Sequence, residues 1–205
     1  MRQRRRHHPA RGRDGRRGGG SGTATEEPSD GEQAPSGAPA DADTDPEACD
    51  GTVGAVRVEE VEVPDGATCV LDGTSVAGNV RVGSDATFDA GAVDVDGDVQ
   101  AEGARAVDMT AASVVQGNIQ VEQGGSSTVT DTRIDGNLRW EAQSDPLVAE
   151  HNTIDGNLQA EENRGGLTVA DNTIDGNLPC GSNDPAPDGG GNAGSGDREG
   201  QCSDL

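Results

Sequence analysis

The residues of this sequence whose chemistry is easiest to assign are its four cysteines. Cys49 and Cys69 lie 20 residues apart, and Cys180 and Cys202 lie 22 residues apart. Such residues form either disulfides or free thiols, and metal binding is disfavoured because the sequence contains no Cys-x-x-Cys motif. Disulfides persist in oxidising compartments, so a paired arrangement predicts an exported protein.

A second candidate for chemistry is a series of evenly spaced aspartates. Asp135, Asp155 and Asp175 each precede a glycine, and Asp96 stands in the same context earlier in the chain. If these residues stack about 4.8 Å apart, neighbouring carboxylates repel each other by about 1 kcal/mol in water. A bound Ca²⁺ ion would relieve that repulsion. The competing interpretation is a solvated acidic turn or adaptation to high salt, so these three aspartates are candidate metal ligands and no other cofactor is expected.

Side chains that could build an active site are sparse. His7 and His8 lie in an arginine-rich N-terminal segment, and His151 occupies a position that other repeats fill with Glu or Asp. The chain has no Tyr and no Lys, its acids are spread throughout, and its repeats have no long insertion to form a cleft. We therefore expect no catalytic residues and a non-enzymatic protein.

An internal repeat must position these side chains. A Gly-Asn/Asp-aliphatic triplet occurs six times at intervals of 19 or 20 residues, which is the signature of a repeat architecture. Its glycines are Gly78, Gly97, Gly117, Gly136, Gly156 and Gly176. The polar residues that follow are Asn79, Asp98, Asn118, Asn137, Asn157 and Asn177. We expect the glycine to permit a turn or close packing, and the asparagine to bond to its stacked neighbours.

Around each triplet, apolar and polar residues alternate. The residues two before, two after and four after the glycine are mostly aliphatic, whereas the residue three after it is mostly polar. A period of two indicates β-strands with one face inward. Trp140 falls in an inward column, so we predict a core position for it rather than a sugar-stacking surface.

The repeat length predicts an all-β fold, a single-stranded parallel β-helix or β-solenoid of about six to seven coils of 19–20 residues. The solenoid is expected over residues 51–180. Residues 1–50 are expected to be a disordered basic arm plus an acidic, Pro/Gly-rich leader, and residues 181–205 a C-terminal cap and disordered tail. Leu205 is the only Leu, Ile, Val or Phe in these two segments. One coil separates the members of each cysteine pair, which predicts the disulfides Cys49–Cys69 and Cys180–Cys202, one at each end.

Charge and hydropathy limit the partners. The net charge is −23, and residues 1–20 contain eight arginines. Nucleic acid is an unlikely partner because the acidic remainder repels phosphate, and no apolar window approaches the ~18 residues of a transmembrane segment. Export normally needs an apolar signal region, yet a Gly/Ser/Thr-rich stretch follows Arg17. A mis-assigned start, unconventional or absent export, and an arm that binds an anionic surface all remain open.

The chain from about Cys49 to Leu205 resembles a family of uncharacterised secreted β-solenoid proteins of high-GC Gram-positive bacteria. The resemblance rests on the first coil over Val63–Thr74, the Gly-Asn-aliphatic repeats with Gln-Ala-Glu at 100–102 and 159–161, and the tail Asn183–Asn192 through Cys202. It implies export with a cleaved signal and no established activity. A second similarity, to the polymerising bactofilins, lies in the Gly-x-aliphatic rhythm; disulfides at the ends argue against such polymers.

Together these features predict an exported, structural or adhesive β-solenoid of the cell envelope or extracellular space. Its partner would be a cell-envelope component or a second copy of the chain. One alternative is a Ca²⁺- or glycan-binding module that uses the acidic face. Another is a bactofilin-like scaffold that forms polymers.

Overall fold

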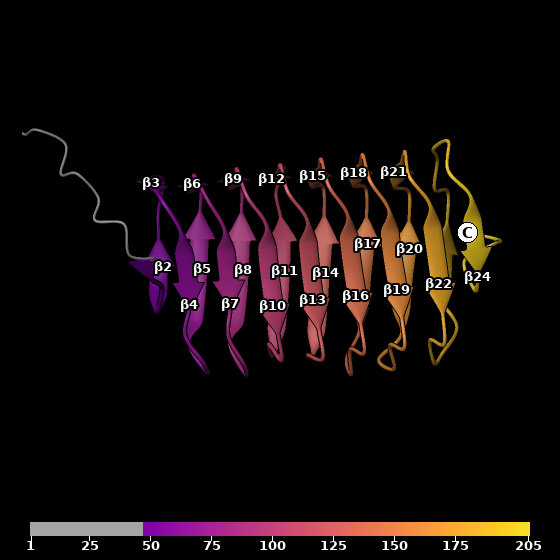
Figure 1. Ribbon diagram of the computed structural model, residues 1–205, viewed down its shortest axis with the longest axis horizontal. Helices are drawn as coiled ribbons and strands as arrows, with labels where there is room; N and C mark the ends of the chain where they lie inside the picture. The colour runs from indigo at the N-terminus through magenta and orange to yellow at the C-terminus, as the bar shows by residue number, and fades with distance from the viewer. Residues whose placement is uncertain (1–46) are drawn as a thin grey trace, which may run out of the picture. The chain divides into compact units, whose positions relative to one another are not determined.

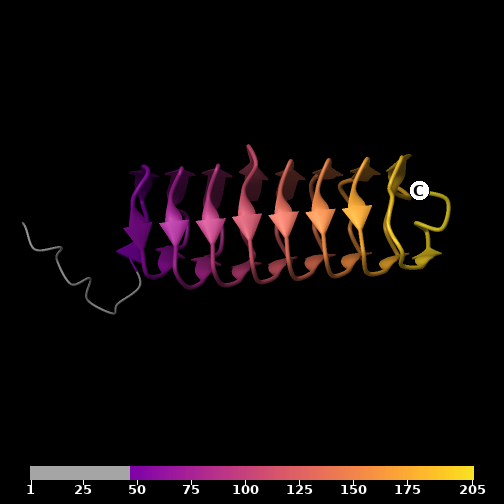
Figure 2. The same ribbon diagram turned by 90° about the horizontal axis from the view of Figure 1, so that it is seen from above.

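The computed structural model describes residues 47–205, which form a parallel β-solenoid (Figures 1 and 2). Each complete coil adds one strand to each of three sheets, which contain nine, eight and seven strands. The predicted all-β solenoid is confirmed, but it has about eight coils instead of six to seven. Residues 1–46, where most of the predicted disorder falls, lie outside the described residues.

The strands are short, and their order along the chain repeats from coil to coil. Sheet A contains β1 (Glu47–Ala48), β4 (Val61–Val63), β7 (Val80–Val82), β10 (Val99–Glu102), β13 (Ile119–Glu122), β16 (Leu138–Glu141), β19 (Leu158–Glu161), β22 (Leu178–Gly181) and β24 (Arg198–Gly200). Sheet B contains β2 (Gly51–Val53), β5 (Thr68–Asp72), β8 (Thr87–Gly91), β11 (Ala106–Thr110), β14 (Ser126–Thr130), β17 (Leu147–Glu150), β20 (Leu167–Ala170) and β23 (Asp188–Gly190). Sheet C contains β3 (Arg57–Val58), β6 (Ser75–Val76), β9 (Asp94–Val95), β12 (Val114–Val115), β15 (Arg133–Ile134), β18 (Thr153–Ile154) and β21 (Thr173–Ile174).

All paired strands are parallel and in register, so equivalent residues of successive coils stack on one another. Ile119 pairs with Leu138, which pairs with Leu158, and the three form part of one inward column. The same register stacks outward residues, so that Glu102, Glu122 and Glu141 follow one another on the surface. The register therefore creates both the core columns and the surface columns.

The core is a narrow stack of inward side chains, which explains how a chain poor in aliphatic residues folds. From β4 to β22, strands of sheet A alternate buried and non-buried residues, and each strand of sheet C adds one buried aliphatic. The predicted core position of Trp140 is confirmed, because its side chain is fully buried. In the same coil, β17 contributes only the small Ala149 at its second buried position. In sheet A, the small Ala160 of the next coil pairs with Trp140.

The solenoid extends beyond the predicted limits of 51–180 at both ends. β1 begins at Glu47, while β23 and β24 continue the sheets through residue 200. The expectation of a disordered tail after residue 180 is therefore wrong. Aliphatic alternation cannot reveal these strands, because Gly189 and Gly200 occupy inward-column positions. A Cβ on either glycine would lie 2.0–2.2 Å from a carbonyl oxygen of the preceding coil, so backbone pairing there requires glycine.

Candidate functional site

Both predicted disulfides are present, one at each end of the described solenoid. Cys49–Cys69 joins the first coil to the second with a Cα–Cα distance of 5.4 Å, and Cys180–Cys202 spans 5.3 Å near the last coil. All four cysteines are buried, and within residues 47–205 none is free. Leu205 packs against the core beside this C-terminal closure. The disulfides therefore fasten the terminal coils, which have neighbours on one side only.

The glycines of the repeated triplets are required for close packing rather than for an unusual backbone turn. None of the six has a positive φ. A Cβ on Gly156 would lie 2.5 Å from the carbonyl oxygen of Gly136 and 2.6 Å from Oδ1 of Asn137. The Gly156 N–H also donates a 3.0 Å hydrogen bond to that same carbonyl oxygen. Successive coils approach so closely here that any side chain would push them apart.

The polar residue after each glycine belongs to a hydrogen-bonded ladder along the solenoid. Oδ1 of Asn137 accepts bonds from the backbone N–H of Asn157 at 2.8 Å and from its Nδ2 at 3.1 Å. Backbone N–H bonds of the same type run between all consecutive members, which are Asn79, Asp98, Asn118, Asn137, Asn157, Asn177 and finally Asp197. The ladder satisfies backbone donors in turns where no strand can pair with them.

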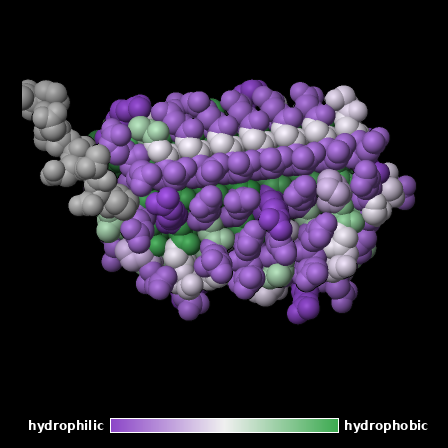
Figure 3. Space-filling model, in the orientation of Figure 1, coloured by the Kyte–Doolittle hydropathy of each residue, from purple (hydrophilic) through white to green (hydrophobic). Residues whose placement is uncertain are grey.

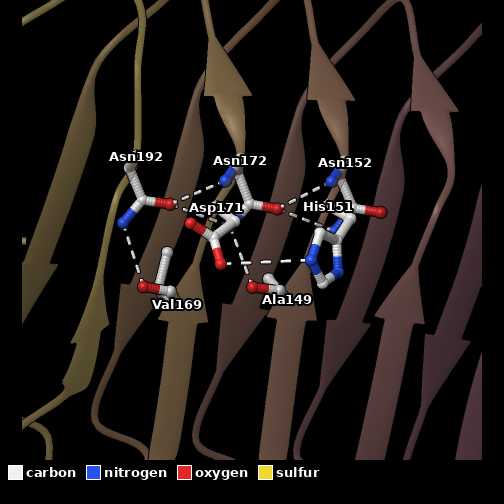
Figure 4. A network of polar contacts seen from close by, with 7 residues as sticks. All are labelled: Ala149, His151, Asn152, Val169, Asp171, Asn172 and Asn192. Carbon is white, nitrogen blue, oxygen red and sulfur yellow. Dashed lines mark hydrogen bonds and ion pairs between the residues drawn. The ribbon is translucent and has the colours of Figure 1, made fainter.

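Two further ladders, which the repeated triplet does not predict, lie at the other corners. Between sheets A and B the chain stacks Gln143, Asn163, Asn183 and Gln201. Between sheets B and C it stacks Asn152, Asn172 and Asn192 (Figure 4). Spacings of 20 residues among these asparagines were a visible signal. Earlier coils hide the columns, because they carry Ala104 and Ser113 at the corresponding corners.

His151 lies at the same corner as the ladder of Asn152. It is one of the non-glycine residues with a positive φ, 58°, directly before the ladder position. Its Nε2 lies 3.9 Å from Oδ2 of Asp171, and both side chains are largely exposed (Figure 4). The pair is a solvent-exposed contact between consecutive coils. Both residues have a left-handed backbone conformation at equivalent turns.

Arginine side chains contact the aspartate column, in which a bound Ca²⁺ ion was a candidate. Arg133 Nη2 lies 2.8 Å from Oδ1 of Asp135 and 2.6 Å from Oδ2 of Asp155. Asp96, earlier in the column, is 3.4 Å from Arg57. Asp175 forms no ion pair with another residue of 47–205. In the same range, no three His, Cys, Asp or Glu side chains are arranged to hold a metal ion.

The outward face of sheet A carries the most regular array of polar side chains. Glu102, Glu122, Glu141 and Glu161 stack in one column, next to a column of Arg81, Gln100, Gln120, Arg139 and Gln159. Arg139 bridges two glutamates, with Nη1 3.2 Å from Glu122 and Nη2 in contact with Glu141. A groove of about 320 Å³ lies among the earlier members of both columns.

Sheet B carries a carboxyl group with a perturbed pKa. Burial raises the pKa of Asp108, and the adjacent carboxylate of Asp89 raises it further. Hydrogen bonds from Thr128 act in the opposite direction; its backbone N–H donates to Oδ1 at 3.1 Å. Within residues 47–205, neither Asp108 nor Asp89 belongs to a cluster that could hold a metal ion.

Comparisons with known proteins add no assignment. No protein-family model, curated protein or solved structure matches the chain. Among the described residues, no helix is long and apolar enough to cross a membrane.

Proposed function

We propose that the protein is an exported, non-enzymatic solenoid rod with a structural or adhesive role in the cell envelope or outside the cell. The observation that carries this proposal is the pair of disulfides that fasten its terminal coils. Disulfides of this kind persist in oxidising compartments. Eight coils at about 4.8 Å each give a rod about 40 Å long, whose three ladders hold the surface columns in fixed positions.

Two features favour this proposal over its alternatives. Arg133 occupies the space between Asp135 and Asp155 where Ca²⁺ would need open carboxylates. At the C-terminal end, Cys202 and Leu205 cover the core, whereas a polymer built end to end would need that surface open. These two features support a rod that displays its sides, rather than a Ca²⁺-binding module or an end-to-end polymer.

The test is to locate the protein and the redox state of its thiols in one experiment. Cells that produce the full chain are treated with a thiol-alkylating reagent before lysis and then separated into cytoplasm, envelope and medium. We expect the protein in the envelope or medium with all four cysteines protected from alkylation. Cytoplasmic protein with alkylated cysteines would refute export. Sedimentation of the purified, oxidised protein as long polymers would favour the bactofilin-like alternative.

A further inference from the structure

The groove on the outward face of sheet A has a chemical composition that identifies a ligand class. Its walls are Arg81 of β7, Gln100 and Glu102 of β10, and Gln120 and Glu122 of β13, with Ala101 between them. Figure 3 shows hydrophilic side chains in rows along the molecule, with narrow strips of apolar surface between the rows. The groove is thus a polar channel on a rigid, strand-built floor.

Several polar groups in this groove have no partner within residues 47–205. No side-chain hydrogen bond or ion pair in that range engages the amides of Gln100 and Gln120 or the carboxylate of Glu102. Each amide offers an acceptor oxygen and two N–H donors, and the carboxylate offers further acceptors. These side chains are accessible to solvent, and a ligand that both donates and accepts hydrogen bonds could replace water at all three.

The charges around the groove favour a neutral ligand. Arg81 lies at one side, 3.6 Å from Glu60, and the guanidinium of Arg139 adjoins Glu122 at the other. A polyanion would meet the carboxylates of Glu102 and Glu122, while a polycation would meet the two arginines. Hydroxyl groups complement both signs, because each hydroxyl donates one hydrogen bond and accepts others.

The register of sheet A places equivalent side chains in rows parallel to the solenoid axis, so an elongated ligand that contacts one row would lie along that axis. Gln100 stacks on Gln120 and Glu102 on Glu122, so the same pair of groups occurs on two consecutive coils about 4.8 Å apart. Arg81 and Arg139 continue the glutamine column on either side. An extended sugar chain with one ring per coil meets this pattern. We infer that the groove binds a neutral, extended glycan that lies along the solenoid axis.

The experiment measures binding of cellohexaose and chitohexaose to the full, oxidised chain by calorimetry, with hexa-arginine and oligogalacturonate as charged comparators. The double variant Gln100→Ala/Gln120→Ala is compared with Gln159→Ala, which removes the same side chain from the same column outside the groove. We expect the double variant to bind more than about tenfold more weakly, since each lost hydrogen bond is worth roughly fivefold. The Gln159→Ala protein should bind within about twofold of wild type.

Three results would overturn the inference. These are no binding of either neutral oligosaccharide at millimolar concentration, equal binding by the double variant, or preferential binding of a charged comparator. Because these glutamines point outward, unchanged thermal unfolding of the variants confirms that a loss of binding is local. The outcome is independent of export and of the redox state of the cysteines, so it tests the groove separately from the proposed function.

Discussion

At the scale of single residues, some buried polar side chains of the solenoid have hydrogen-bond partners and others have none within residues 47–205. Oγ of Ser113 donates to the Thr110 carbonyl at 2.6 Å and accepts from the backbone N–H of Val93 at 3.3 Å. Within the described residues, Oγ of Ser127 and Nε1 of Trp140 are buried without a partner. Ser127 belongs to an inward column of sheet B in which the neighbouring coils carry apolar residues, including Phe88 and Leu147.

This contrast predicts opposite effects for two serine substitutions at equally buried sites. Ser127→Ala removes an unpaired hydroxyl and should raise the free energy of unfolding by about 1 kcal/mol. Ser113→Ala removes two hydrogen bonds and should lower it by about 1–2 kcal/mol. Urea denaturation followed by circular dichroism measures both. A loss of stability in Ser127→Ala as large as that in Ser113→Ala would show that its hydroxyl has a partner.

A second residue-scale prediction concerns pH. Burial raises the pKa of Asp108 above its ordinary value of 3.8, so the folded protein holds this proton more tightly than the unfolded chain. The ionised carboxylate therefore destabilises the fold at neutral pH, and this cost disappears as the pH falls toward 3.8. Asp108→Asn should be more stable than wild type at about pH 7, with the difference shrinking near pH 4. Urea midpoints at both pH values test this, and a less stable variant at neutral pH would contradict it.

At the scale of the element, the corner ladders carry hydrogen bonding that the strands cannot supply. Asn172 is buried; its Oδ1 accepts from the backbone N–H of Asn152, and its Nδ2 donates to the Ala149 carbonyl at 2.8 Å (Figure 4). Asn177, on the ladder at the Gly-Asn turns, makes equivalent backbone contacts but is exposed to solvent. Water can replace the hydrogen bonds of the exposed Asn177 but not those of the buried Asn172.

The two ladders should therefore differ in sensitivity to truncation. Asn172→Ala leaves several buried backbone and side-chain groups without partners and should cost about 3 kcal/mol or more. Asn177→Ala should cost about 1 kcal/mol or less, because water reaches the freed groups. Thermal and urea unfolding of both variants provide the comparison. Equal losses would mean that solvent exposure does not determine the contribution of a ladder.

The sequence predicts elements well where each coil repeats the same residues and poorly elsewhere. Six copies of the Gly-Asn/Asp triplet reveal one ladder, and the cysteine spacing reveals which coils are joined. The other ladders stay hidden because early coils use Ala104 and Ser113 at those corners. The last strands stay hidden because Gly189 and Gly200 pair through the backbone alone. The groove on sheet A could not be predicted, because the alternation of residue types does not show which outward side chains form hydrogen bonds or ion pairs with one another.

At the scale of the whole molecule, the register that builds the core also stacks like charges. Glu102 and Glu161 lie at the two ends of the glutamate column, and within residues 47–205 neither forms an ion pair, unlike the two glutamates bridged by Arg139. Neighbouring carboxylates about 4.8 Å apart repel each other by about 1 kcal/mol in water, and dissolved salt screens that repulsion. The net charge of −23 adds a general repulsion of the same sign.

We therefore expect stability to rise with ionic strength. The unfolding midpoint should increase between about 0.01 M and 0.5 M NaCl, where the screening length shortens from about 30 Å to a few ångströms. The variant Glu102→Gln/Glu161→Gln should be more stable at low salt and show a smaller salt dependence. Thermal unfolding across the salt series measures both quantities. A wild-type midpoint that falls or stays constant would show that the stacked carboxylates do not limit stability.

The central claim is that the chain folds as one solenoid whose register brings Cys49 to Cys69 and Cys180 to Cys202. Non-reducing peptide mapping by mass spectrometry tests it most directly. Cleavage after arginine, including Arg57, Arg164 and Arg198, places the four cysteines in four different peptides. The predicted result is two cross-linked peptide pairs, 49 with 69 and 180 with 202, in protein alkylated before unfolding. Any other pairing, or alkylated thiols in protein purified under oxidising conditions, would contradict the account.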